Sequence, residues 1–144
     1  MKTKYLPLLA IIAITTSCKK DKTNAQCAKT KETIANVYSI VKIEIGTGSV
    51  YADLTPGLED CQKDDKILLQ LNGSAVYEDL GVKCEPDASS SGTWNIDNAG
   101  KVTINTARGS DISSAEITSF DCTTLILTAT EPGTNDHLRI TLKK

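Results

Sequence analysis

The chain of 144 residues has few of the side chains on which most catalytic and nucleic-acid-binding sites depend. It has one histidine, one tryptophan, one phenylalanine and one methionine, and its only arginines are Arg108 and Arg139. A single histidine offers little for a proton relay or a zinc site. The formal net charge is −2 and the lysines beyond the N-terminal segment are scattered, so no basic stripe could follow a nucleic acid. We therefore expect neither catalysis nor nucleic-acid binding.

Motifs for catalysis, cofactors and metals are also absent from the sequence. No glycine-flanked serine forms a nucleophile elbow, and no glycine-rich phosphate loop follows a strand. The acidic residues between Glu59 and Asp65 lack the spacing of a calcium loop and are typical of a solvated turn. His137 follows Asp136 just before a strand, where an exposed edge position is expected. We expect no cofactor and no metal.

No apolar run is long enough to span a membrane as a helix. The longest, Tyr5–Ile14, has about ten residues, whereas a span needs roughly twenty. Lys2 and Lys4 precede it, and small polar residues up to Ser17 follow it. A basic start, a short apolar core and small residues before a cleavage point predict a secretory signal.

Cys18 stands where that signal would be cut, and the segment resembles a bacterial lipoprotein signal. The resemblance implies that residues 1–17 are removed, that Cys18 is lipidated, and that 18–31 form a polar tether to a domain at 32–144. Two or three acyl chains would anchor the protein stably to a membrane. Thr15 stands where such signals usually carry leucine, so a plain secretory signal cut near Ser17 is the alternative.

Four further cysteines remain: Cys27, Cys61, Cys84 and Cys122. An even number in an exported domain predicts two disulfides, with three possible pairings. Zinc is disfavoured because no two of them have the spacing of two to four residues that is usual for paired ligands.

Turn chemistry helps to choose the pairing. Asn72-Gly73 separates two apolar-rich runs and is a strong hairpin signal. A two-residue turn would place Cys61 opposite Cys84, and a three-residue loop would shift the register by one residue. Either register leaves the two thiols close together, so we predict a Cys61–Cys84 bond and therefore a Cys27–Cys122 bond.

The rest of the chain consists of short, alternating, strand-like runs separated by turn residues. Tight connections between such runs predict consecutive antiparallel neighbours, with one buried and one solvated face. We predict an all-β fold, a small antiparallel up-and-down barrel of about eight strands, with a β-sandwich as the alternative. The expected strands are 34–45, 50–54, 67–71, 74–80, 92–97, 101–106, 113–120, 123–130 and 137–142.

Several short stretches resemble one known family. They are Asp60–Asp65, the following Asn72-Gly73 hairpin, Cys84, Gly92-Thr93-Trp94 and Leu125–Leu127. They are similar to the small lipocalin-like domains of exported lipoproteins from Gram-negative bacteria. The resemblance implies a lipocalin-like barrel, lipid-anchored to the outer membrane, and implies no reaction.

A barrel of this size has room for one small ligand or for its own side chains. The first hypothesis is therefore a binding protein for a small hydrophobic molecule. The alternative is a non-catalytic envelope protein with a side-chain-filled barrel, whose outer face contacts a protein or glycan. The sequence does not indicate an oligomeric state. Candidate lining residues are Trp94, Ile96, Val102, Ile104, Leu125 and Leu127, with Tyr38 and Tyr77 at the mouth.

Overall fold

The computed structural model describes residues 27–83, 89–106, 112–130 and 133–144. The predicted signal segment, Cys18 and Cys84 lie outside these residues. No described helix is long and apolar enough to cross a membrane. In chain order the elements are α1 (Lys31–Ile34), β1 (Asn36–Thr47), β2 (Val50–Asp53), η1 (Thr55–Gly57), α2 (Asp60–Lys63), β3 (Lys66–Leu69), β4 (Ser74–Glu78), β5 (Ser90–Ile96), β6 (Lys101–Thr106), β7 (Ile112–Phe120), β8 (Thr124–Thr130) and β9 (Asp136–Lys143).

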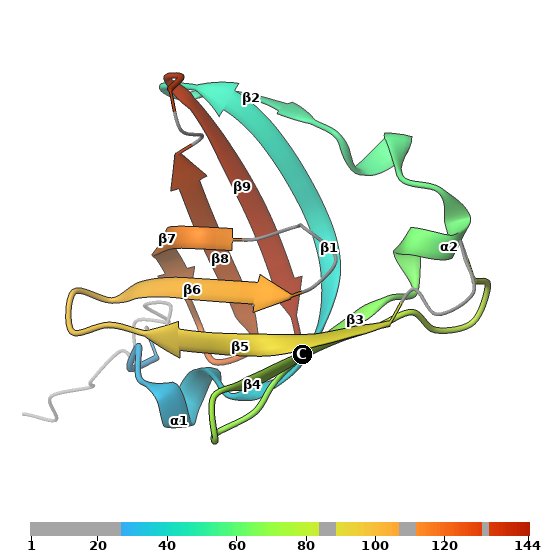
Figure 1. The fold of residues 1–144 in the computed structure, drawn as a ribbon. Coiled ribbons are helices and arrows are strands. Elements are labelled where there is room, and N and C mark those ends of the chain that lie inside the picture. The colour runs from blue at the N-terminus through green and yellow to red at the C-terminus, as the bar shows by residue number, and fades with distance from the viewer. Residues whose placement is uncertain (1–26, 84–88, 107–111, 131–132) are drawn as a thin grey trace, which may run out of the picture.

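The nine strands form one closed antiparallel sheet (Figure 1). The strand order is β2-β1-β3-β4-β5-β6-β7-β8-β9, and a further β1–β9 pairing joins the two ends. The predicted all-β antiparallel barrel is therefore confirmed, and a sandwich of two separate sheets is excluded by the β1–β9 hydrogen bonds. β2 and β3 pair with the same edge of β1, β3 near its start and β2 near its end.

One extra residue in β1 decides which side chains enter the barrel. Ile40 pairs with Leu142 but Lys42 pairs with Thr141, so Val41 is a bulge. Side chains alternate along a strand, and one inserted residue moves the following set to the other face. Tyr38 and Ile40 therefore face inward before the bulge. After it the inward residues are Ile43 and Ile45, while Lys42 and Glu44 face outward.

One end of the barrel is closed by α1 and by aromatic side chains. Ile34 of α1 is fully buried, and its carbonyl oxygen accepts a hydrogen bond from Tyr38 Oη at 2.7 Å. Trp94 Nε1 donates to Gln70 O at 2.7 Å, so this buried ring also has its polar atom satisfied. The sequence predicted a strand from Ile34, whereas the strand begins at Asn36 and Ile34 ends a short helix.

The Asn72-Gly73 hairpin has a three-residue loop, the longer of the two predicted lengths. Leu69 pairs with Ala75, and Gln70 N donates to Ser74 O at 2.8 Å, so three residues form the loop. Gly73 has φ +91°, the left-handed conformation that such a loop needs at its last position. The β3–β4 register is therefore shifted by one residue from that of a two-residue turn.

A disulfide links the N-terminal part of the described chain to the barrel. Cys27 forms a disulfide with Cys122, and Cys27 N donates to Phe120 O at 3.0 Å. The packed domain therefore includes Cys27 to Lys31, which the sequence analysis assigned to the tether. Cys61 is also disulfide-bonded, and its predicted partner Cys84 lies outside the described residues.

We predict that replacing Cys27 and Cys122 with serine lowers the free energy of unfolding by about 2–5 kcal/mol, because the bridge closes a long loop across a sequence separation of 95 residues. Cys122 has φ +75°, a conformation that favours glycine. A Cys27→Ser/Cys122→Gly variant should therefore be about 1 kcal/mol more stable than the double-serine variant. Urea unfolding checks both values. Equal stability of the wild-type and double-serine proteins would contradict the prediction.

Candidate functional site

The interior of the barrel is densely filled toward the end that α1 closes. The hydrophobic core is contributed by α1 and by every strand except β2. Its fully buried members include Ile34, Tyr38, Ala75, Val102, Ala115, Leu125 and Leu142. Burial raises the pKa of Tyr38 to about 12, since its hydroxyl is held away from water. This half of the barrel is a packed core.

The structure places most of the predicted lining residues in this core. Six of the eight belong to the buried cluster, while Ile96 and Tyr77 are partly buried and pack against it. Tyr38 does not lie at the mouth: it is 0% exposed and its hydroxyl bonds to α1 at the closed end. A role for any of the eight in holding a ligand stays a prediction. The six in the cluster are Tyr38, Trp94, Val102, Ile104, Leu125 and Leu127.

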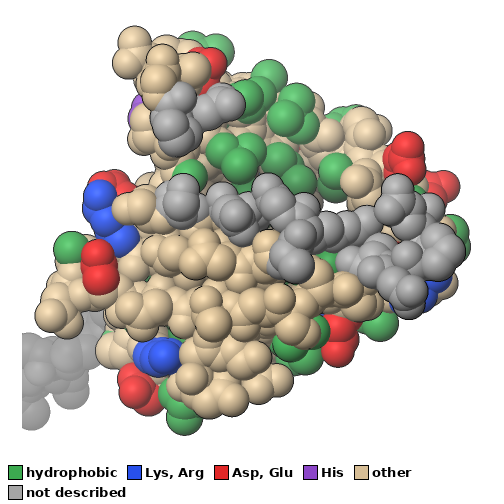
Figure 2. Space-filling view, viewed as in Figure 1, with side chains coloured by type: hydrophobic (Ala, Val, Ile, Leu, Met, Phe, Trp, Pro, Cys, Tyr) green, Lys and Arg blue, Asp and Glu red, His purple; other side chains and the backbone are tan. Residues whose placement is uncertain are grey.

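The other end of the barrel is open and has an aliphatic side that is only partly buried. Ile43 pairs with Ile140, which pairs in turn with the core residue Leu127, so all three face inward. Ile45, Leu138 and Ala129 extend this inner face toward the strand ends. Figure 2 shows hydrophobic side chains gathered in the hollow above β6, where the inner faces of β1 and β9 are visible. We call Ile43, Ile45, Ala129, Leu138 and Ile140 the aliphatic wall.

The sequence did not indicate the aliphatic wall, and the reasons differ between β9 and β1. Leu138 and Ile140 were recognised as one face of a strand, but nothing in the sequence said that this face would be only partly covered. Ile43 and Ile45 lie on the opposite parity from Tyr38, and only the bulge at Val41 brings both sets inside.

Polar side chains occupy the β3–β4–β5 side of the same open end. Tyr77 Oη donates to Asp65 Oδ2, and Leu80 N donates to Asp65 Oδ1 at 3.3 Å. Tyr77 pairs with Ser90 of β5. Lys66 pairs with Glu78, so the next pair in the same register would place Asp65 opposite Asp79. We call Asp65, Tyr77, Asp79 and Ser90 the polar cluster. The open end is therefore apolar on one side and acidic on the other.

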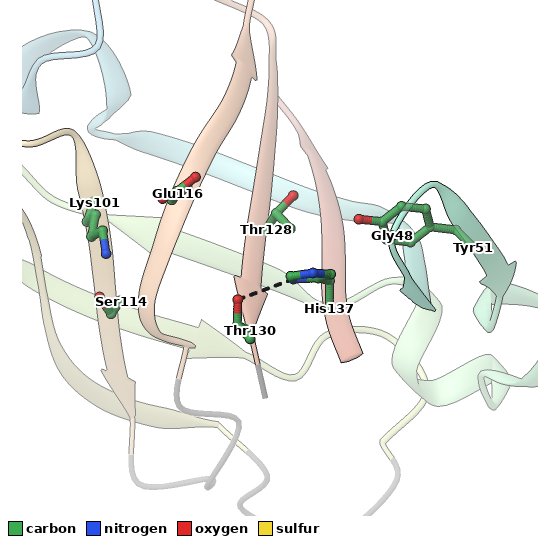
Figure 3. A pocket seen from close by; sticks show the side chains of 8 residues that line it. All are labelled: Gly48, Tyr51, Lys101, Ser114, Glu116, Thr128, Thr130 and His137. Carbon is green, nitrogen blue, oxygen red and sulfur yellow. Dashed lines mark hydrogen bonds between the residues drawn. The ribbon is translucent and has the colours of Figure 1, made fainter. Parts of the chain in front are cut away.

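A second hollow lies on the outer face of the barrel. It has a volume of about 550 Å³, and its lining is mostly polar. In Figure 3, side chains from β6, β7, β8 and β9 line one side, and the β1–β2 hairpin lines the other. His137 Nδ1 lies 3.2 Å from Thr130 Oγ1 within it, so His137 is a groove residue rather than an isolated edge position. The lining residues of this outer groove are Gly48, Tyr51, Lys101, Ser114, Glu116, Thr128, Thr130 and His137.

The aromatic residue of the outer groove, Tyr51, contacts Arg139, which forms an ion pair with the nearly buried carboxylate of Glu44. The Arg139 guanidinium carbon lies 3.9 Å from the centre of the Tyr51 ring. Arg139 Nε and Nη2 donate to the two carboxylate oxygens of Glu44 at 2.7 and 2.8 Å, and Lys42 Nζ donates to Glu44 Oε1 at 2.8 Å. These hydrogen bonds, that from Arg139 first, lower the pKa of Glu44 to about 2. This ion pair also links β1 to β9.

The described residues of the two hollows do not form a metal site. Among the residues that the structure describes, no group of three or more histidine, cysteine, aspartate or glutamate side chains could hold a metal ion. Asp65 and Asp79 are therefore a pair without a third such ligand among the described residues.

Comparison with known proteins agrees with this architecture. Residues 34–127 match the family of lipocalin-like domains. The match covers more than half of the chain, and the chain therefore belongs to the lipocalin-like domain family. No curated protein and no solved structure gives a significant match.

We predict that Glu44→Gln destabilises the protein at neutral pH but not in strong acid. The folded pKa of about 2 lies below the ordinary value of 4.5, so the ionised carboxylate stabilises the fold above about pH 4.5. That contribution is lost as the pH falls toward 2. Urea midpoints of the two proteins should therefore differ at pH 7 and converge near pH 2.

The matched control for this measurement is Asp60→Asn. Asp60 forms an exposed ion pair with Lys63 at 2.7 Å, and exposed pairs contribute little. Its urea midpoint should stay close to that of the wild type at both pH values. A Glu44→Gln protein as stable as the control at pH 7 would contradict the assigned role of the ion pair.

Proposed function

We propose that this protein is a non-catalytic binding protein that holds a small hydrophobic molecule in the open end of its barrel. The observation that carries the proposal is the aliphatic wall: branched side chains that face inward yet remain partly exposed. Exposed apolar surface on an inner face is unfavourable in water, and an apolar ligand would remove it from contact with water. The packed core below the wall would serve as a rigid floor.

The size of the site suits a small ligand. Covering apolar surface contributes roughly 25 cal/mol per Å², so contact with a few branched side chains supports binding of modest affinity. The packed core limits how deep a ligand could enter. Trp94 lies in that core, 2% exposed, so binding at the wall need not alter its fluorescence and a direct binding measurement is the better test.

We predict that Leu138→Ala weakens the binding of a straight-chain apolar probe, dodecanol, about tenfold, because it removes methyl groups from the middle strand of the wall, between Ile45 and Ala129. Isothermal titration calorimetry measures the two dissociation constants directly. The control is Val37→Ala, which removes methyl groups from an exposed position of β1 outside the barrel and should leave binding unchanged. Failure of the wild-type protein to bind dodecanol and other apolar probes would overturn the proposed function.

The proposal includes a lipid anchor on Cys18, on the outer membrane of a Gram-negative cell. Its support is the sequence pattern around Cys18 and the resemblance of the domain to those of exported lipoproteins. The Cys27–Cys122 disulfide is consistent with export to an oxidising compartment. An anchor there would hold the binding domain at the membrane surface, where apolar molecules concentrate.

We expect the intact mass of the protein from a Gram-negative expression host to equal residues 18–144 plus the acyl groups on Cys18. Cys18→Ser should abolish the added mass and release the protein from the membrane fraction. An unmodified chain that begins after Ser17 would contradict the anchor while leaving the ligand proposal intact.

A second candidate function is supported by the outer groove. A polar hollow of about 550 Å³ with an aromatic residue at its edge suits a glycan or a partner's surface loop. In that case the barrel is only a scaffold, displayed by its anchor on the envelope. The second candidate takes precedence if no apolar probe binds the open end.

A further inference from the structure

The polar cluster contains a buried carboxylate, that of Asp79, without a hydrogen-bond partner among the described residues. Asp79 is 1% exposed, and neither of its carboxylate oxygens has a hydrogen-bond partner in the part of the chain that the structure describes. Its backbone N donates to Ser89 Oγ at 3.2 Å, but this satisfies only the main chain. Burying an ionised carboxylate without a partner is among the costliest arrangements in a protein.

The neighbours of Asp79 increase the need for a positive charge. Asp65 is also 1% exposed, and it accepts hydrogen bonds from Tyr77 and Leu80. Those bonds come from uncharged donors. No salt bridge between described residues involves Asp65 or Asp79; the three that exist use Glu44 and Asp60. Two carboxylates therefore face each other across β3 and β4, and no described cationic side chain forms an ion pair with either.

A third unsatisfied atom, in a second residue, lies in the same cluster. Ser90 Oγ is buried and has no hydrogen-bond partner among the described residues. Ser90 pairs with Tyr77 of β4. The side chains of Ala75 and, beyond the strand end, Asp79 face the same side as that of Tyr77. Ala75 is fully buried in the core, which places this face of β4 on the inside of the barrel. The unsatisfied atoms on the inner face are thus two carboxylate acceptors and one hydroxyl, which can also accept.

The ends of the strands place this cluster at the same end of the barrel as the aliphatic wall. β1 ends at Thr47, which pairs with Asp136 at the start of β9, and β8 ends beside it at Thr130. β3 begins and β4 ends at this end as well, because both run antiparallel to their neighbours in the ring. One ligand could therefore contact apolar side chains on one side and carboxylates on the other.

We propose that Asp79, assisted by Ser90, binds the ammonium group of an amphipathic amine whose hydrocarbon part lies against the aliphatic wall. This inference rests on the proposed function and specifies its ligand class. An ammonium group carries three N–H donors and one positive charge, which match an unpartnered carboxylate and a hydroxyl acceptor. A fatty acid would instead bring a third carboxylate to Asp65 and Asp79.

The test compares three probes with the same hydrocarbon chain: dodecylammonium, dodecanol and dodecanoate, each titrated calorimetrically into the full chain at pH 7. Dodecylammonium should bind at least about tenfold more tightly than dodecanol, and dodecanoate should bind most weakly. In Asp79→Asn, which keeps the size of the side chain, dodecylammonium should fall to the affinity of dodecanol. Dodecanol itself should bind the variant as it binds the wild type.

The control variant is Asp60→Asn, which removes an exposed carboxylate paired with Lys63 and should keep the preference for the ammonium probe. Equal affinities of dodecylammonium and dodecanol for the wild type would overturn the inference and leave the proposed function standing. No binding of any probe would overturn both. Because the wild-type comparison is decisive alone, the test does not depend on the folding of Asp79→Asn.

A small metal cation is the competing occupant, and a separate titration distinguishes it. Calcium chloride without any amphiphile should leave the melting temperature unchanged, because the described residues provide only two acidic ligands here. A rise in melting temperature with calcium in the wild type that is absent in Asp79→Asn would overturn the ammonium assignment in favour of a metal site.

Discussion

The barrel depends on the way in which β1 closes the ring, and that closure depends on the single extra residue Val41. β1 is the one strand that pairs with three others, with β2 and β3 on one edge and β9 on the other. Without the bulge, the parity that buries Tyr38 would turn Lys42 and Glu44 into the barrel. With it, the two charged residues lie outside, where Glu44 pairs with Arg139 of β9. The same shift turns Ile43 and Ile45 inward.

The buried polar groups at the two ends of the barrel differ in their hydrogen bonding. At the closed end, Tyr38 and Trp94 are buried with their polar atoms bonded to main-chain carbonyl groups, and this end is a satisfied core. At the open end, the Asp79 carboxylate and Ser90 Oγ are buried without partners among the described residues. Proteins concentrate such unfavourable features where a ligand or a function compensates for them. This contrast is why we propose both the ligand site and its ammonium specificity at the open end.

Much of the fold could be predicted because it follows from local patterns. Alternation of apolar residues located the strands, as at Lys101–Thr106, and Asn72-Gly73 located a hairpin. The loop length of that hairpin was left open, because Asn-Gly suits more than one turn and the choice depends on the pairing of β3 with β4. Helix α1 was missed because four residues show no periodicity, and packing of Ile34 against Tyr38 stabilises the turn instead.

The sequence by itself determined the class of fold, through cysteines available for disulfides and strand periodicity that only an all-β domain satisfies. These features are local, and each is encoded within a few neighbouring residues. Only the tertiary structure decided the site, because the aliphatic wall and Asp79 derive their character from strands far apart in the chain. Whether an isoleucine is covered, or a carboxylate has a partner, depends on what the closed ring brings beside it.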